Sequence, residues 1–149
     1  MRAIQTTNIS ETVAGIADRI NASLAFAEIW VPGDCRTPHD LFYLLKSSTS
    51  FKHDRPGIEQ IQSMQTLFTE NIHGVPGAGD CDCLTVAACA CLHVINYDCG
   101  LVLQGNGKYA THVLAYYIGP QGNIYPFDLT ENFNELRPYK KSQYIQINF

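Results

Sequence analysis

The segment GAGDCDC, residues 77–83, brings two thiols and two carboxylates together directly after a glycine turn. Cysteines in such a segment can ligate a metal, form a disulfide or supply a nucleophile. Apolar residues follow it at helical spacing, as at Leu84 and Ala88, so we expect a helix to begin here. Residues two apart on a helix point about 200° apart. Cys81 and Cys83 therefore cannot bind one ion together or form a local disulfide.

Cys81 has the position that suits a nucleophile. Asp80 is a good N-cap residue, which puts Cys81 at the first helical position. There the helix dipole stabilises a thiolate by about 0.3 to 1 kcal/mol, while the carboxylates of Asp80 and Asp82 oppose it. Cys81 also continues the apolar face of the helix, so we expect its sulfur to face a sheet. A nucleophile in this place needs a base from a strand.

The segment THVLAYYI, residues 111–118, supplies such a base in His112. A single histidine on an apolar strand is most often a core residue. The next predicted strand, however, returns through the turn GPQGN, and pairing of Ile118 with Ile124 would place Asp128 diagonally next to His112 on the same face. Diagonal neighbours have backbones about 7 to 8 Å apart, which lets a carboxylate accept a hydrogen bond from an imidazole.

Cys81, His112 and Asp128 follow one another along the chain in the order nucleophile, base and orienting carboxylate. Three motifs contain them: GDCD at residues 79–82, THVLAYY at 111–117 and YPFDLT at 125–130. In order and spacing these motifs resemble the transglutaminase-like branch of the papain-type cysteine enzymes, in forms found among bacterial and bacteriophage proteins, over residues 58–130. The resemblance implies that the three residues form a catalytic triad.

The resemblance also implies a reaction. The thiolate would attack an amide or ester carbonyl, and the resulting thioester would pass to water or to an amine, so a hydrolase such as a thiol protease and a transamidase are both expected. The substrate would be a peptide, isopeptide or peptidoglycan-type cross-link, and the chemistry needs no cofactor. Enzymes of this type place a side-chain oxyanion donor upstream of the cysteine, for which Gln65 and Asn71 are both candidates. Related domains often carry an aspartate where this chain has Cys83.

Two other functions compete with this hypothesis. Cys89 and His93 are four residues apart and could give two ligands to zinc, although no spacing indicates the other two. Otherwise Cys83 and the cysteines after it are expected to be buried as small hydrophobic residues. The second competitor is a non-enzymatic structural or assembly protein, for example a virion component. Such a protein would keep the fold while the helices within residues 1–57 dock on a larger assembly.

Helices are expected in the first half of the chain and strands in the second. The predicted helices span residues 10–30, 39–47, 58–70 and 81–95, and the predicted strands span 100–104, 111–118, 123–129 and 143–149. Residues 47–57 are expected to form a loop. This order favours one α+β domain over residues 1–149, with the N-terminal helices and a central Cys-bearing helix packed on an antiparallel sheet. Residues 58–149 would form its transglutaminase-like core.

Length and composition limit the remaining choices. A chain of 149 residues can bury a core without metal or disulfides. The net charge of −4, with no basic cluster beyond residues 137–141, argues against nucleic acid or an anionic membrane as partner. The N-terminus lacks the apolar stretch of a secretory signal and no segment is long enough to span a bilayer, so we expect a cytoplasmic protein, or a packaged one if it is phage-encoded. Without export, the six cysteines are expected to stay reduced.

Overall fold

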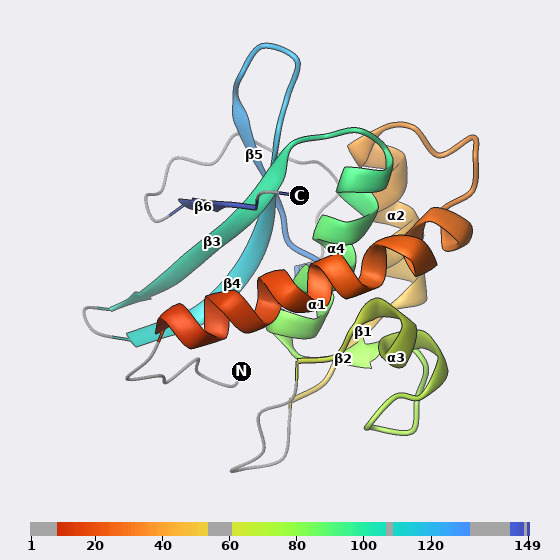
Figure 1. The fold of residues 1–149 in the computed structure, drawn as a ribbon, viewed down its shortest axis with the longest axis vertical. Helices are drawn as coiled ribbons and strands as arrows, with labels where there is room; N and C mark the ends of the chain where they lie inside the picture. The colour runs from red at the N-terminus through yellow and green to blue at the C-terminus, as the bar shows by residue number, and fades with distance from the viewer. Residues whose placement is uncertain (1–8, 54–60, 107–108, 132–143, 148) are drawn as a thin grey trace.

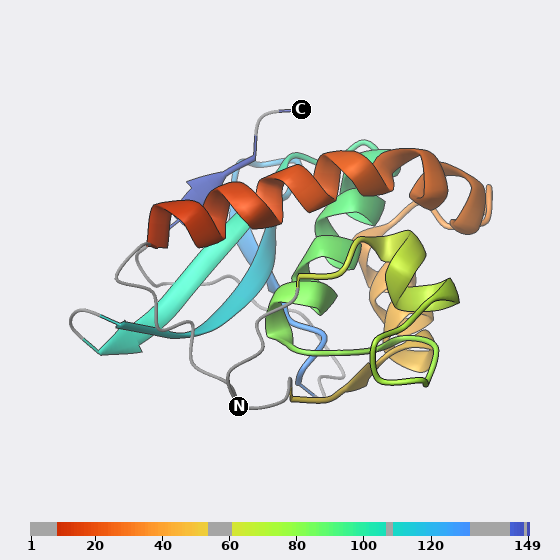
Figure 2. The ribbon, with the colours of Figure 1, turned by 60° about the horizontal axis from the view of Figure 1, so that its bottom comes forward.

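One helix, α4, lies between the other helices and the sheet (Figure 1). The computed structural model describes residues 9–53, 61–106, 109–131, 144–147 and 149. The helices are α1 (Ile9–Trp30), α2 (Pro38–Ser48), α3 (Met64–Thr69) and α4 (Cys81–Val94). The strands are β1 (Ser50–Phe51), β2 (Ala78–Gly79), β3 (Cys99–Asn106), β4 (Tyr109–Ile118), β5 (Ile124–Phe127) and β6 (Tyr144–Gln146). Figure 2, turned from the first view, shows α1 running across α4, against which it packs.

Strands β5, β4, β3 and β6 lie in that order in one antiparallel sheet. The expected combination of helices with an antiparallel sheet is therefore confirmed. The predicted pairing of Ile118 with Ile124 across the turn is also confirmed. This register follows from the short turn between β4 and β5, because a short hairpin connection fixes which residues stand opposite each other.

Helix α4 is buried on all sides, as its composition requires. Every residue from Cys81 to Leu92 is buried, and the helix packs against α1, α2, α3 and the strands β3 and β4. A helix that is apolar around its whole circumference is stable only in the interior of a protein. The residue at its N-terminus, Cys81, is therefore held by a helix that is packed in the core.

Two features differ from the expected elements. Helix α3 begins at Met64, well inside the predicted range 58–70, because the hydroxyl of Ser63 caps it by accepting from the Thr66 N–H at 3.2 Å; residues 58–60 lie outside the described part. In addition, β1 falls within the predicted loop 47–57 and pairs with β2 in a two-stranded parallel sheet. Two-residue strands carry no periodic pattern, so the sequence gives no signal for this pairing.

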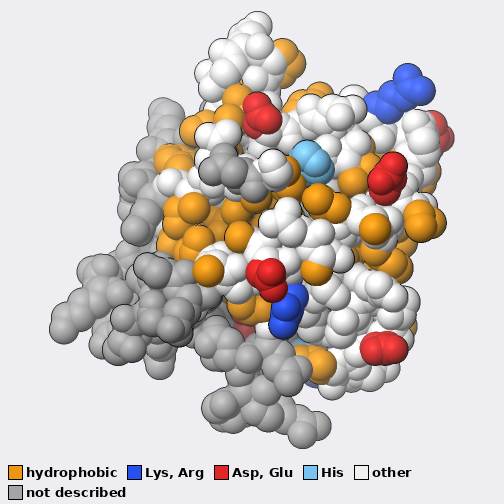
Figure 3. All heavy atoms as spheres, in the orientation of Figure 1, with side chains coloured by type: hydrophobic (Ala, Val, Ile, Leu, Met, Phe, Trp, Pro, Cys, Tyr) orange, Lys and Arg blue, Asp and Glu red, His pale blue; other side chains and the backbone are white. Residues whose placement is uncertain are grey.

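The surface of the described residues shows no large field of one charge on the face drawn in Figure 3. The few acidic and basic side chains seen there are scattered among apolar and uncharged groups and do not gather into a patch of one sign. Nucleic-acid binding typically requires a continuous basic surface. Among the described helices, none is long and apolar enough to cross a bilayer.

Candidate active site

The structure brings His112 and Asp128 into direct contact. The imidazole Nε2 of His112 lies 2.8 Å from Oδ2 of Asp128, and the two residues are only 7% and 6% exposed. Asp128 comes immediately after Phe127, where β5 ends opposite Ala115 of β4. The diagonal relation expected from the hairpin register therefore places the two side chains together, as predicted.

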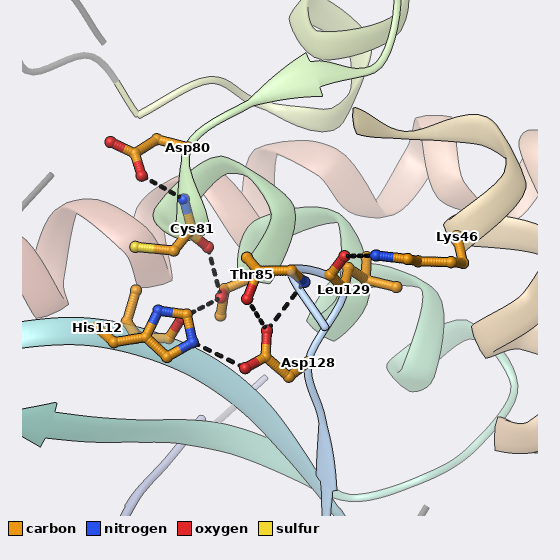
Figure 4. Close-up of polar contacts among 9 residues, drawn as sticks. Lys46, Asp80, Cys81, Thr85, His112, Asp128 and Leu129 are labelled. Atoms are coloured by element: carbon orange, nitrogen blue, oxygen red, sulfur yellow. Dashed lines mark hydrogen bonds and ion pairs between the residues drawn. The ribbon is translucent and has the colours of Figure 1, made fainter. Parts of the chain in front are cut away.

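Thr130 fixes the orientation of the Asp128 carboxylate. Its backbone N–H and its hydroxyl both donate to Oδ1 of Asp128, at 3.0 and 2.7 Å, which leaves Oδ2 for His112 (Figure 4). Burial raises the pKa of Asp128, but the hydrogen bond and charge of His112, with the two bonds from Thr130, outweigh it and lower the pKa below 3.8. The carboxylate is thus ionised at neutral pH and can only accept. His112 therefore carries a proton on Nε2.

Cys81 begins α4 beside the edge of β4. The Asp80 side chain caps the helix by accepting from the Cys81 N–H at 2.7 Å, as predicted. The backbone of Val113 makes a hydrogen bond to the Cys81 sulfur, and the hydroxyl of Thr85 lies 2.7 Å from the carbonyl oxygen of Cys81 and 3.3 Å from that of Val113.

The end of β5 explains why α4 can reach β4 at this point. The Ile118 N–H donates to the carbonyl of Asp98, on the β3 side of β4. Successive residues of a strand direct their backbone groups to opposite neighbours, so the odd-numbered residues of β4 direct theirs toward β5. Since β5 stops at Phe127, opposite Ala115, it does not reach Val113. The first turns of α4 occupy this place and provide partners for the backbone of Val113.

Cys81 and Asp128 lie on different sides of the same imidazole. Figure 4 shows the sulfur on the side of the ring that carries the second nitrogen, Nδ1, away from the contact between Nε2 and Asp128. In a neutral imidazole whose Nε2 bears the proton, Nδ1 is the acceptor. The arrangement can therefore accept a proton at Nδ1, on the side of the ring where the Cys81 sulfur lies.

The Cys81 thiol does not have the low pKa that its place at a helix N-terminus predicts. Burial raises its pKa most, the Val113 backbone lowers it, and the charges of Asp80 and Asp82 raise it further, with the result far above the ordinary 9.0. The prediction from the helix dipole is wrong. Cys81 is only 1% exposed, so desolvation destabilises its thiolate more than the helix dipole stabilises it. Cys81 is a neutral thiol at neutral pH.

The remaining cysteines are free thiols, and all of them are buried. Cys83 accepts from the backbone N–H of Gln62 at 3.2 Å. The thiol of Cys89 lies 3.6 Å from the carbonyl oxygen of Gly100. These contacts agree with the expectation that the later cysteines are small core residues.

Cys89 and His93 do not share a site in the part of the chain that the structure describes. Cys89 is directed into the core toward β3, whereas the ring of His93 stacks on Phe149 at 3.8 Å between centroids. Within the same residues no group of three or more potential metal ligands comes together. Zinc would need further ligands beyond this pair.

Neither expected oxyanion donor points to the cysteine. Gln65 is exposed on α3, and Asn71 donates through Nδ2 to the carbonyls of Leu67 and Ala78, at 2.8 and 2.7 Å. Those two bonds use both hydrogens of the Asn71 amide.

The role of Thr130 in fixing the Asp128 carboxylate was not predicted from the sequence. Its position two residues after an aspartate is typical of an Asx turn and was the available signal.

Comparison of the chain with protein-family models, with curated proteins and with solved structures finds no match.

Proposed function

We propose that this protein is a cysteine-dependent acyl-transfer enzyme that acts through a thioester. Cys81 is the nucleophile, His112 is the general base and acid, and Asp128 orients the imidazole. The observation that carries the proposal is the buried 2.8 Å contact between His112 and Asp128, next to a cysteine that begins a helix and takes a hydrogen bond from the residue after His112. A cysteine, a base and an orienting carboxylate grouped at one place are the arrangement that covalent acyl transfer uses.

The protonation states define how the reaction starts. Because Cys81 is a neutral thiol, its proton passes to Nδ1 of His112 as the sulfur attacks the substrate carbonyl carbon, and the carbonyl oxygen takes the negative charge. The imidazolium then protonates the leaving amine, the carbon–nitrogen bond breaks and a thioester remains. Water or a second amine attacks the thioester, His112 accepts its proton, and the proton returns to the departing sulfur.

A peptide, isopeptide or peptidoglycan-type cross-link is the proposed substrate class, and this chemistry requires no cofactor. Hydrolysis and transamidation share every step up to the thioester. They differ only in whether the pocket admits water or holds an amine in place.

Brief labelling with a limiting amount of iodoacetamide near neutral pH, followed by peptide mapping, tests the proposal. Cys35 is 9% exposed and Cys81 only 1%, so exposure alone would make Cys35 react first. Assistance from His112 instead makes Cys81 the fastest of the six thiols. We expect Cys81→Ala to abolish the fast phase and Cys83→Ala, two residues along, to spare it. Labelling that follows exposure would contradict the proposal.

The burial of Cys81 favours one alternative, a structural or assembly protein that retains this arrangement without activity. In that case the contact between His112 and Asp128 stabilises the fold only. The labelling experiment separates the two functions, since a structural protein would show no thiol of unusual reactivity at Cys81.

A further inference from the structure

Helix α2 holds the loop that carries Asp128. The ammonium of Lys46 donates to the carbonyl oxygen of Leu129 at 2.7 Å, across 83 positions of the chain (Figure 4). One turn earlier on α2, the ring of Phe42 packs edge-to-face on Phe127, with centroids 5.3 Å apart and planes at 80°. The residue before Asp128 and the residue after it are therefore both anchored to the same helix.

The segment that follows α2 is joined to the other side of the site. Strand β1 pairs with β2, Ser50 opposite Ala78 and Phe51 opposite Gly79, and β2 ends one residue before the cap of α4. The Ser50 N–H donates to the carbonyl of Gly77 at 3.0 Å. Residues 38–51 thus contact both stretches of chain, the one that leads into Cys81 and the one that carries Asp128.

We infer that Lys46 is a positioning residue for the acyl transfer proposed above, on which this inference rests: it holds the loop after β5 so that the Asp128 carboxylate meets His112. Thr130 fixes the carboxylate only relative to its own loop. Since β5 has ended, the loop is not held by the sheet ladder, and the bond from Lys46 ties it to the helical layer. A charged donor makes this bond stronger than one between neutral groups.

The test uses the full chain and the variants Lys46→Met and Lys46→Arg, with Lys52→Met as control. Methionine keeps the apolar stem and removes the donor, while arginine keeps a charged donor. The Lys52 residue is exposed, and the bond that it makes to the Gly79 carbonyl is donated by its backbone N–H, which the substitution keeps. The first readout is the proton NMR signal of the His112 Nε2–H that contacts Asp128, and the second is the labelling rate of Cys81.

We expect Lys46→Met to lose the His112 signal and to label Cys81 about 10-fold more slowly, as displaced catalytic groups do. Lys46→Arg should restore both, and Lys52→Met should leave both unchanged. If Lys46→Met does not fold, Lys46→Gln replaces it. The glutamine side chain is too short to reach the Leu129 carbonyl, so the same loss of the His112 signal and the same slower labelling of Cys81 are expected. An unchanged signal and rate in the folded variant would overturn the inference.

If the proposed function itself is wrong, the labelling experiment gives a different result. In that case Cys81 of the unaltered protein labels no faster than Cys35, whatever the His112 signal does, and both the function and the role of Lys46 in it are refuted. Loss of the signal with an unchanged, fast Cys81 rate refutes Lys46 alone.

Discussion

At the scale of single residues, the proposed reaction depends on the ionised carboxylate of Asp128. Its lowered pKa means that it accepts from His112 throughout the neutral range. This acceptor sets the tautomer, and the tautomer leaves Nδ1 able to take the Cys81 proton. Thr130 supplies both donors to the other oxygen. A small change at Asp128 should therefore affect the reactivity of a cysteine that it does not touch.

Asp128→Asn tests this relation. Asparagine keeps the shape and an oxygen for Thr130, so the fold should survive, but its amide lets the imidazole adopt the wrong tautomer. We expect the labelling rate of Cys81 to fall by about 10-fold or more, and His112→Gln, which removes the base, to lower it by about 100-fold. Asp98→Asn, at an exposed aspartate before β3, is the matched control. A fall in the denaturation midpoint with no change in labelling would show that the pair is structural.

At the scale of elements, the start of α4 depends on the turn before it. Gly77 has φ of +82°, and a Cβ there would collide with the carbonyl oxygen of Ser48 at the end of α2. The turn therefore packs against α2 with no space for a side chain. This close approach, together with the pairing of β1 and β2, fixes where Cys81 begins its helix.

Gly77→Ala and Gly74→Ala form a matched pair of variants. Gly74 also has a positive φ, +72°, but open space around its Cα. Both substitutions carry the backbone strain of about 1 kcal/mol, and Gly77→Ala should lose about 1 to 3 kcal/mol more from the collision. Urea unfolding measures the difference. Equal losses at the two positions would mean that α2 moves away freely, and that the turn does not locate Cys81.

At the scale of the whole molecule, the buried thiols couple stability to pH. Burial raises the pKa of Cys81 and Cys91, and the contact with Cys99 followed by burial raises that of Cys89, all above the ordinary 9.0. Above pH 9.0 the unfolded chain loses these protons while the folded chain keeps them. The stabilisation is therefore complete below pH 9.0 and is lost as the pH rises further.

We expect the urea midpoint in reducing buffer to fall between pH 8 and pH 10. Each of the three thiols can contribute about 1.4 kcal/mol of lost stability per pH unit above 9.0. Cys91→Val, which removes one titrating group from the core, should reduce the steepness of the fall and is the comparison to make. A constant midpoint over this range would show that the thiols ionise within the folded protein.

The amino-acid sequence by itself determined those features that local periodicity and short connections control. The apolar repeat after Asp80 predicts the buried helix and its cap. The alternation along residues 111–118 and the short turn after it predict the register of β4 and β5, and hence the contact between His112 and Asp128. These features depend on neighbours within one element or one hairpin, where the geometry of helix and strand leaves few alternatives.

Only the tertiary structure decided how the parts combine. Because β5 ends early, the backbone of Val113 bonds to the first turns of α4 instead of to β5. The resulting burial raises the pKa of Cys81, whereas its position on the helix predicts a lowered pKa. The bond from Lys46 joins residues 83 positions apart. No periodic pattern records such contacts, because they arise when separate elements pack and desolvate each other's polar groups.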